Sequence, residues 1–255
     1  MNVPLLLTFA RQDLVDRYAG SLLGAGWTFL HPLAQILIFV AIFSGLMGAR
    51  LPGSDATYGY SIYLVSGLIA WLAFANTVTR TCDVFAAKGG ILRKVPVPLM
   101  HLPLYIVLSE SVIYIISLSL FGAFLLAIGQ GPTPAVVLLP FVFALQQLFA
   151  YALGLWVAML GVFFKDLREL VTVLLQFWFW FTPIVYVDTI LPPWASALLV
   201  YNPANAFISA YHAMFIPGET VAIAPLVALV VVVQGLLMAA YGAFRKLEKD
   251  LRDFL

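Results

Sequence analysis

Long runs of apolar residues alternate with short polar segments along the whole chain. Six of these runs approach the ~20 residues that a helix needs to cross ~30 Å of hydrocarbon. They are continuous and show no alternation with a period of two, which argues against an outer-membrane barrel. The pattern predicts an all-α integral membrane protein with six spans, over residues 27–48, 60–79, 102–128, 136–163, 171–187 and 221–244.

The segment before the first run, residues 1–26, has the pattern of an amphipathic helix. Such a helix lies in the membrane interface, and we expect this one on the cytoplasmic side, with a frayed terminus as the alternative. The segment has no apolar run of about 7–15 residues near its start, so we expect no cleavable signal peptide. Four residues share one face of a helical wheel and three polar residues lie opposite: Leu7, Ala10, Leu14 and Tyr18 against Thr8, Gln12 and Asp16.

Prolines divide the segment between the last two predicted spans. Pro192-Pro193 can open a helix, Asn202-Pro203 forms a cap-and-start pair, and Pro217-Gly218 ends the next piece. Each piece has about 10 residues, too few to span, so we expect a re-entrant helical hairpin within 189–216. We interpret this segment as an extracytoplasmic gate, against the alternative of a simple interfacial hairpin. Its candidate gate residues are Trp194, Tyr201, Asn202 and Pro203.

Composition and charge give the class of protein and its orientation. Hydrophobic residues make up 63% of the chain and charged residues only 10%, whereas charged residues make up roughly a quarter of a soluble domain. Twelve of the thirteen Lys and Arg residues fall in residues 1–26, 80–101, 164–170 or the C-terminal tail, and only Arg50 lies elsewhere. Because Lys and Arg are retained on the cytoplasmic side of short loops, we expect both ends of the chain in the cytoplasm.

Several kinds of chemistry find no support in the sequence. Cys82 is the only cysteine, and His31, His101 and His212 lie far apart without a metal-ligand spacing. We therefore expect no metal site. No lysine follows a glycine, so the chain has no G-x-x-x-x-G-K-[ST] phosphate-binding loop and is not expected to hydrolyse ATP. The net charge of +1 indicates no nucleic-acid partner.

Two cytoplasmic segments carry unusual concentrations of charge. "GGILRKVPVP", in the loop 80–101, presents a short charged turn between helix-breaking Gly and Pro residues. "FFKDLRELV" places a compact mixed-charge turn at 164–170. Each loop is at least a topology anchor. Together they indicate a docking surface for a cytoplasmic partner.

Four stretches of the chain resemble the membrane subunit of a polysaccharide-export ABC transporter, the permease family for O antigen, capsule and teichoic acid. They are "RQDLVDRYAGSLLGAGWTFLHPLAQ", "GGILRKVPVPLMHLP", "FKDLRELVTVLLQFWFWFTPIVY" and "YNPANAFISAYHAMF". They occur in the family's order and cover nearly the whole chain. Lys165 stands where the family often has arginine, while Asp166 and Leu167 keep its pattern.

The resemblance implies a half-transporter in the bacterial inner membrane. Its six spans would pair in a homodimer with two separate ATPase chains, which would bind ATP and Mg. The substrate would be a lipid-linked polysaccharide. The two charged loops would be where the permease meets its ATPase, through Lys88, Ile91, Leu92, Arg93, Lys94, Lys165, Asp166, Leu167 and Arg168.

Aromatic residues concentrate in "QFWFWFTPIVY". Sugars can stack their flat faces on aromatic rings, although Trp and Tyr also form belts at membrane interfaces. By resemblance the first and fifth spans line the channel, which makes Phe39, Phe43, Phe177, Trp178, Phe181 and Tyr186 candidate channel residues. Glu110, the one carboxylate inside a span, must face protein or water, as a pore residue or a helix contact.

Two other functions compete with polysaccharide export. One is the export of a drug or a lipid by the same kind of transporter. The other is a membrane-embedded glycan polymerase or transferase, which would need clustered carboxylates or histidines at one membrane face. Asp55, Asp188 and Glu219 are instead scattered singly.

Overall fold

The computed structural model describes residues 3–52, 56–92 and 98–254, and these residues form helices and turns without any strand. Five stretches are long and apolar enough to cross a membrane: Gly24–Leu46, Gly59–Thr81, Leu99–Ala127, Pro134–Phe163 and Ile223–Glu248. They overlap five of the six predicted spans. The chain is therefore a multi-pass helical membrane protein.

The five long stretches combine regular and irregular helix. The first consists of a 3-10 turn, α2 (Trp27–Phe39) and a π-helical segment, Val40–Leu46. The second is α3 (Gly59–Thr81), and the third joins a 3-10 turn to α6 (Leu104–Ala127). The fourth joins a 3-10 turn, Pro134–Leu138, to α7 (Leu139–Phe163), and the fifth lies within α11 (Ile223–Phe254).

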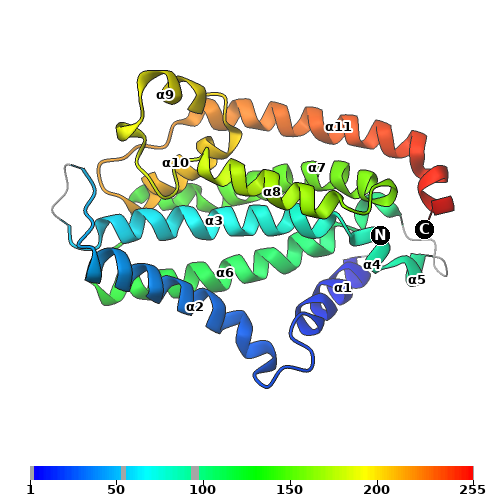
Figure 1. Cartoon of the computed structure of the whole chain (residues 1–255), viewed down its shortest axis with the longest axis horizontal. Coiled ribbons are helices and arrows are strands. Elements are labelled where there is room, and N and C mark those ends of the chain that lie inside the picture. The colour runs from blue at the N-terminus through cyan, green and yellow to red at the C-terminus, as the bar shows by residue number, and fades with distance from the viewer. Residues whose placement is uncertain (1–2, 53–55, 93–97, 255) are drawn as a thin grey trace.

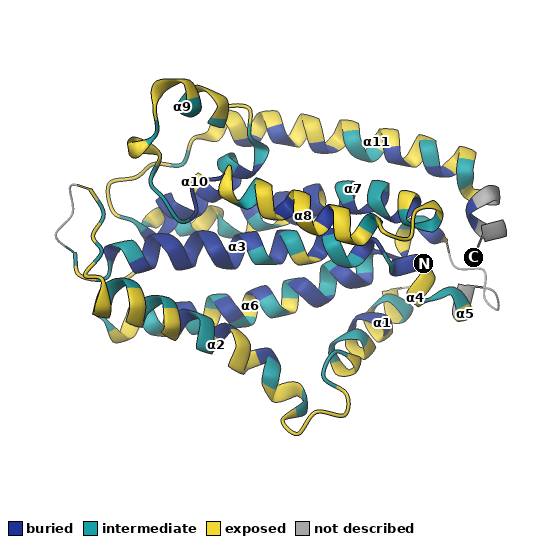
Figure 2. Cartoon of the chain, in the orientation of Figure 1, coloured by how far each residue is buried: buried dark blue, intermediate teal, exposed yellow. Residues whose placement is uncertain are grey.

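The helix α3 forms the centre of the bundle. It is buried along most of its length, whereas α2 and α11 expose most of their surface (Figure 2). It packs against α6, α7 and α10 (Pro203–Phe215). Small residues permit this close approach: a Cβ at Gly154 of α7 would lie 2.7 Å from Thr81 Oγ1, and one at Gly161 would collide with the Cys82 carbonyl oxygen.

The first helix, α1 (Val3–Asp16), packs along α6 and diverges from α2, so that the two form a V (Figure 1). The helix ends well before residue 26, and turns connect it to α2. The predicted polar residues are exposed and Ala10 is buried as expected, but Leu7 is exposed and Phe9 is buried, so the packed face is rotated from the predicted one. Phe9 and Ala10 belong to a hydrophobic cluster with α4 (Val84–Ala87), α6, α7 and α11, and this packing sets the orientation of α1.

The predicted fifth span differs most from the structure. The helix α8 runs from Leu167 to Trp180, four residues earlier at its start than predicted and seven residues short of the predicted end. Its 14 residues measure about 21 Å at ~1.5 Å per residue, less than the ~30 Å of hydrocarbon. Pro183 explains the early end, because its ring removes a backbone donor and disfavours helical backbone at the residue before it.

The chain beyond α8 folds back into the bundle. After a turn it forms the short α9 (Pro193–Leu199) and then α10, as the proline pattern predicts for two separate pieces. Most of α10 is buried, including Phe207, Tyr211 and Met214. Both chain termini, α4 and α5 (Gly89–Leu92) lie at one end of the molecule, hereafter the terminal end (Figure 1). The helix α9 lies toward the opposite end.

Candidate functional site

An aromatic cleft of about 620 Å³ lies between the end of α8 and α9, away from the terminal end. The structure brings into it all four predicted gate residues and three of the six predicted channel residues. The cleft is lined by Trp178, Trp180, Phe181, Tyr186, Leu191, Trp194, Ala195, Leu198, Leu199, Tyr201, Asn202 and Pro203.

Asn202 holds the two sides of the aromatic cleft together. Its Oδ1 accepts a hydrogen bond from the Trp178 indole N–H at 2.8 Å and another from the Ala204 backbone N–H at 3.0 Å. Its Nδ2 donates to the Phe181 carbonyl at 3.1 Å and to Thr182 Oγ1 at 3.0 Å. Asn202 therefore caps α10 and ties this cap to the end of α8.

The five tryptophans and tyrosines of the cleft have different roles. Trp178 packs edge-on against Phe74 at 5.5 Å and Phe149 at 6.3 Å between ring centroids, so most of it belongs to the core. The Tyr186 hydroxyl donates to the Trp180 carbonyl at 2.9 Å and closes the turn after α8. Exposed aromatic surface comes instead from Trp180, Phe181, Trp194 and Tyr201, whose exposed fractions are 56%, 69%, 70% and 84%.

Trp180 is a cleft residue that the sequence interpretation missed. Five aromatic residues follow one another at 177–181, and helical phase alone does not tell which of them face a cleft. The hydrogen bond between Asn202 and Trp178 determines which rings face the cleft, because this bond turns Trp178 toward α10. The signal in the sequence was the Asn-Pro pair, which requires a partner for the asparagine side chain.

The other three predicted channel residues lie outside the aromatic cleft. Phe39 and Phe43 of the first span stack on each other at 6.1 Å, and Phe43 also contacts Tyr60 at 5.1 Å. Phe177 lies on the exposed side of α8. Phe39 instead lines a second space, a polar cavity of about 270 Å³ between α2, α3 and α6.

A groove lies between the aromatic cleft and the terminal end of the molecule. This groove, of about 680 Å³, runs between α3 and α8 and has Arg17, Arg80 and Arg168 among its lining residues. It shares Trp180 with the aromatic cleft. It also shares five residues with the polar cavity, namely Arg17, Leu68, Leu72, Asn76 and Glu110.

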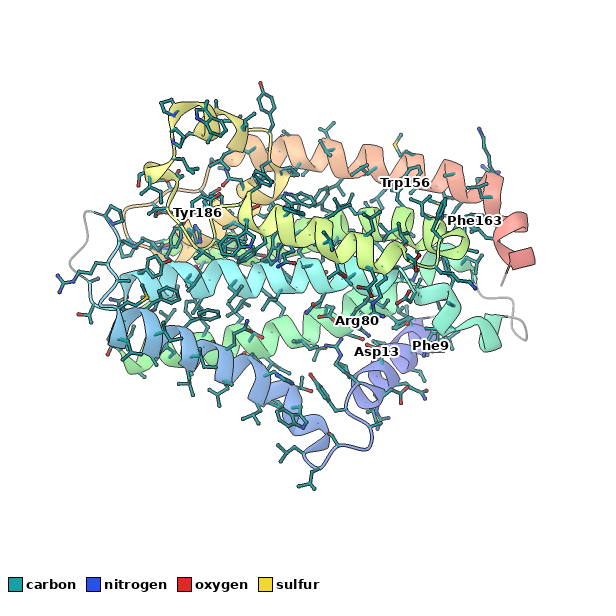
Figure 3. The ribbon with its side chains drawn as sticks, in the orientation of Figure 1. Phe9, Asp13, Arg80, Trp156, Phe163 and Tyr186 are labelled. Atoms are coloured by element: carbon teal, nitrogen blue, oxygen red, sulfur yellow. The ribbon has the colours of Figure 1, made fainter. Side chains whose placement is uncertain are left out.

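A network of four charged side chains lies where the groove and the polar cavity meet. Glu110 is fully buried, and its Oε1 accepts from Arg80 at 2.7 Å and also from Arg17. Arg80 in turn donates to Asp13 at 2.5 Å, between α1 and α3 (Figure 3). Glu110 is therefore a helix contact, as one of the two sequence interpretations held, and it also borders the cavity.

The predicted coupling residues gather at the terminal end, as far as the structure describes them. Arg168 at the start of α8 donates to Asp83 beside α4 at 2.6 Å, which joins the two charged loops. Lys88 lies over the rings of Phe9 and Tyr105, at 5.7 and 5.5 Å from their centroids. Lys165 and Asp166 are exposed, and Leu167 begins α8.

Two pairs of predicted coupling residues need separate mention. Ile91 and Leu92 form the last residues of α5, and only their backbone is described. Arg93 and Lys94 lie outside the described residues.

Acidic residues occur near the end opposite the termini. Desolvation raises the pKa of the Glu219 carboxyl above its ordinary value, and the charge of Asp188 acts in the same direction. In the described part of the chain no group of three or more His, Cys, Asp or Glu residues could hold a metal ion.

Comparison with known proteins identifies the family. The model of the membrane domain of ABC-2 type transporters matches residues 4–216, most of the chain. The chain belongs to the ABC-2 type transporter family. The aromatic cleft, the groove and the polar cavity all lie within the matched part of this ABC-2 chain.

Three relatives of this ABC-2 chain carry informative names. The O-antigen export system permease protein RfbA of Myxococcus xanthus is 32% identical over 98% of this chain and 94% of its own length. A protein of the same name from Klebsiella pneumoniae is 28% identical over 84% and 81%. The polysialic acid transport protein KpsM of Escherichia coli is 21% identical over 81% and 79%.

Proposed function

We propose that this chain is the permease subunit of an ATP-driven exporter that moves a lipid-linked polysaccharide of the O-antigen type across the bacterial inner membrane. The observation that carries the proposal is the aromatic cleft, which lies in a member of the ABC-2 family and shares Trp180 with a groove that extends toward the terminal end. Exposed rings offer a polymer many similar, weak stacking contacts, which suit a chain that must slide.

The proposal includes six crossings and a re-entrant gate. The helix α8 would enter from the cytoplasmic face, and the turn 181–187 would complete the crossing beside α3. Non-helical backbone is tolerated at membrane depth where protein covers it. Tyrosine hydroxyls of α3 provide hydrogen-bond partners for the backbone carbonyls of this turn. The Tyr63 hydroxyl lies 2.8 Å from the Pro183 carbonyl oxygen and 2.9 Å from that of Tyr186, and the Tyr60 hydroxyl donates to the Val185 carbonyl oxygen.

A homodimer would complete the pathway. The groove and the aromatic cleft both open along α8, so one side of the path would be open in a single chain. Two helices near this side carry exposed apolar residues that a second copy would cover, among them Phe29, Leu33, Leu37, Leu170, Val173, Leu174 and Phe177.

The ATPase would be a separate chain that docks at the terminal end, in the cytoplasm. This end presents α4, α5 and the start of α8, and the ion pair between Asp83 and Arg168 makes them one surface. Movements of two ATPase chains, each binding ATP and Mg, would reach the groove through α8. This chain would serve transport and leave catalysis to its partner.

Deletion of the gene tests this function in the source strain. We expect loss of surface polysaccharide, together with accumulation of full-length lipid-linked glycan on the cytoplasmic side, both measured by mass spectrometry. Reintroduction of the wild-type gene should reverse both effects. Normal surface glycan would contradict export of this substrate, and short glycan without accumulation would indicate the polymerase or transferase alternative.

A further inference from the structure

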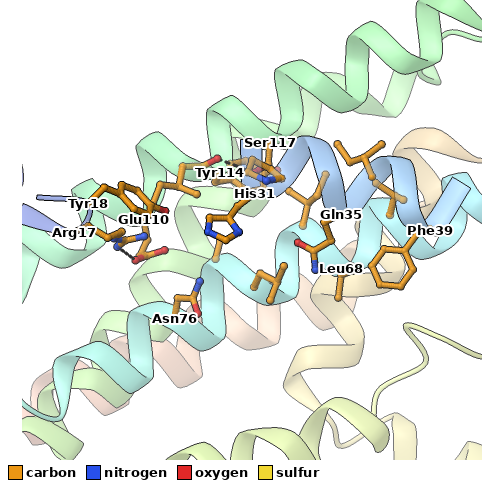
Figure 4. Close-up of a pocket in the computed structure, with 17 residues that line it drawn as sticks. Arg17, Tyr18, His31, Gln35, Phe39, Leu68, Asn76, Glu110, Tyr114 and Ser117 are labelled. Atoms are coloured by element: carbon orange, nitrogen blue, oxygen red, sulfur yellow. Dashed lines mark hydrogen bonds and ion pairs between the residues drawn. The ribbon is translucent and has the colours of Figure 1, made fainter. Parts of the chain in front are cut away.

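The polar cavity between α2, α3 and α6 is unusual for the interior of a membrane protein (Figure 4). Its volume of about 270 Å³ is slightly below the ~300–1,000 Å³ of sites for drug-sized ligands. One half of its wall is aliphatic, whereas the other half carries charged, amide, imidazole and hydroxyl groups. The polar lining residues are Arg17, Tyr18, His31, Gln35, Asn76, Glu110, Tyr114 and Ser117.

Glu110 borders the cavity with a carboxylate that is closed off from it. Its Oε1 is occupied by Arg17 and Arg80, whereas its Oε2 is buried and has no hydrogen-bond partner among the residues that the structure describes. A buried carboxylate oxygen without a partner carries a substantial free-energy cost. A ligand in the cavity does not reach this oxygen, so other side chains must supply its hydrogen bonds.

Two amide side chains add donors and acceptors. Gln35 of α2 and Asn76 of α3 both line the cavity, and neither side chain forms a hydrogen bond within the described part of the chain. Each amide can donate two hydrogen bonds and accept through its carbonyl oxygen. Asn76 is exposed in the middle of an apolar helix, where a polar side chain normally faces a cavity or a pathway.

The charges around the cavity balance. Arg17 and Arg80 are matched by Glu110 and Asp13 in one connected network. An anionic headgroup would therefore compete with these carboxylates for the arginines. An uncharged, hydroxyl-rich group requires no such competition and can use the two amide groups. The ring of Phe39 and the partly exposed ring of Tyr18 supply apolar surface for its flat faces.

We propose that this cavity is a binding subsite for a single uncharged sugar unit of the exported glycan, with Gln35 and Asn76 as its hydrogen-bonding groups. The proposal rests on the proposed export function and adds to it a point of sugar recognition. Its position fits this role, because the cavity shares Asn76 and Glu110 with the groove that leads to the aromatic cleft.

A binding experiment on the intact complex tests the proposal. The complex of this chain with its ATPase is purified in lipid nanodiscs. The first probe is the oligosaccharide repeat released by mild acid from the surface glycan of the source strain, and the second is farnesyl diphosphate, which represents a lipid diphosphate. Affinities are compared for the wild type, the Gln35→Ala/Asn76→Ala variant and the control Gln130→Ala, which lies outside the cavity.

We expect the double variant to bind the oligosaccharide at least tenfold more weakly, while Gln130→Ala binds it like the wild type. Farnesyl diphosphate should not displace the oligosaccharide from the wild type. Because neither replaced side chain forms a hydrogen bond to another described residue, the variant should keep the unfolding midpoint of the wild type. If the midpoint falls by more than a few degrees, Asn76→Ala alone replaces the double variant, with the same expected loss.

Three results would overturn the subsite: no binding of the oligosaccharide to the wild type, equal affinity in the cavity variants, or displacement by farnesyl diphosphate, which would assign the cavity to the lipid headgroup. These results leave the proposed function intact as long as deletion of the gene still abolishes surface glycan. Normal surface glycan in the deletion strain would instead contradict the proposed export function itself.

Discussion

Asn202 forms four hydrogen bonds through one side chain, two at its oxygen and two at its nitrogen. Few residues of this chain join so many elements, because the bonds connect the cap of α10 with the last turn of α8 and with the turn that follows. A single amide therefore ties the position of α10 to the end of α8.

Replacing Asn202 should show what its side-chain oxygen and nitrogen contribute to stability. Asn202→Ala removes an N-cap contribution of about 1 kcal/mol and leaves the Trp178 indole N–H unpaired, at a further cost of ~1–3 kcal/mol. Asn202→Asp keeps the acceptor for Trp178 and Ala204, but it loses the donated bonds and places a charged oxygen beside the Phe181 carbonyl oxygen. Thermal unfolding of the purified chain should rank the wild type above both variants. A wild-type midpoint in Asn202→Ala would argue against the bond to Trp178.

Trp178 and Trp180 should respond differently to substitution although they are two residues apart. Trp178→Ala removes a core ring and should destabilise the fold by about 3–5 kcal/mol. Trp180→Ala removes an exposed ring and should leave the unfolding midpoint nearly unchanged while it reduces surface glycan severalfold. Surface glycan and unfolding are measured side by side, with Phe141→Ala as a control on the exposed side of α7. Normal export by Trp180→Ala would remove its role in the cleft.

At the scale of elements, the two charged loops are built as one surface. The ion pair between Asp83 and Arg168 connects the segment after α3 with the start of α8, and Lys88 anchors the first loop on α1 and α6. A force applied to either loop would therefore be transmitted both to the groove-lining α8 and to α1, which carries Asp13 of the buried charge network.

The ion pair between the loops should matter more for coupling than for stability. Both side chains are about half exposed, and such pairs contribute about 0–1 kcal/mol. Arg168→Asp should therefore unfold like the wild type but export less glycan per ATP hydrolysed, and the exchanged pair Asp83→Arg/Arg168→Asp should recover part of this loss. ATP turnover and export are measured in the same membranes. A single variant with wild-type export per ATP would show that the pair only anchors the loops.

Elements were predictable where the chain carries local signals. Apolar runs bounded by charge gave five long helices, and the proline pairs gave α9 and α10 as separate pieces. The end of α8 was missed because the aromatic residues after Trp180 are as apolar as those before it, although Pro183 marked the break. The partners of Glu110 come from segments 93 and 30 residues away, and only tertiary packing brings them together.

At the scale of the whole molecule, the groove and the aromatic cleft form a series along α8 from the terminal end to the gate. The aromatic cleft contains seven predicted site residues, because the segment predicted as a gate and the predicted fifth span meet in space. The functional residues that the sequence could not reveal, Trp180 and the unpartnered amides, are those whose role depends on which helix face borders a cavity.

Filling the groove should block export without preventing ATP hydrolysis. Ala75 of α3 lines the groove, and Ala75→Trp would place a large ring across it. We expect surface glycan to fall at least tenfold while the complex still assembles and hydrolyses ATP. Ala123→Trp on α6, which lines a different surface depression, serves as the matched control and should export normally. Equal export by both variants would mean that the groove is not part of the path.

The central claim is that this chain moves a finished glycan across the membrane with energy from a separate ATPase. Its most direct test uses inverted membrane vesicles of a strain that expresses the chain with its ATPase, loaded with labelled lipid-linked glycan on the outer face. The measurement is the fraction of glycan that becomes protected from an added glycan-cleaving enzyme. The account predicts protection that requires ATP and disappears in vesicles lacking this chain. Equal protection without the chain, or growth of the glycan in place of its protection, would contradict it.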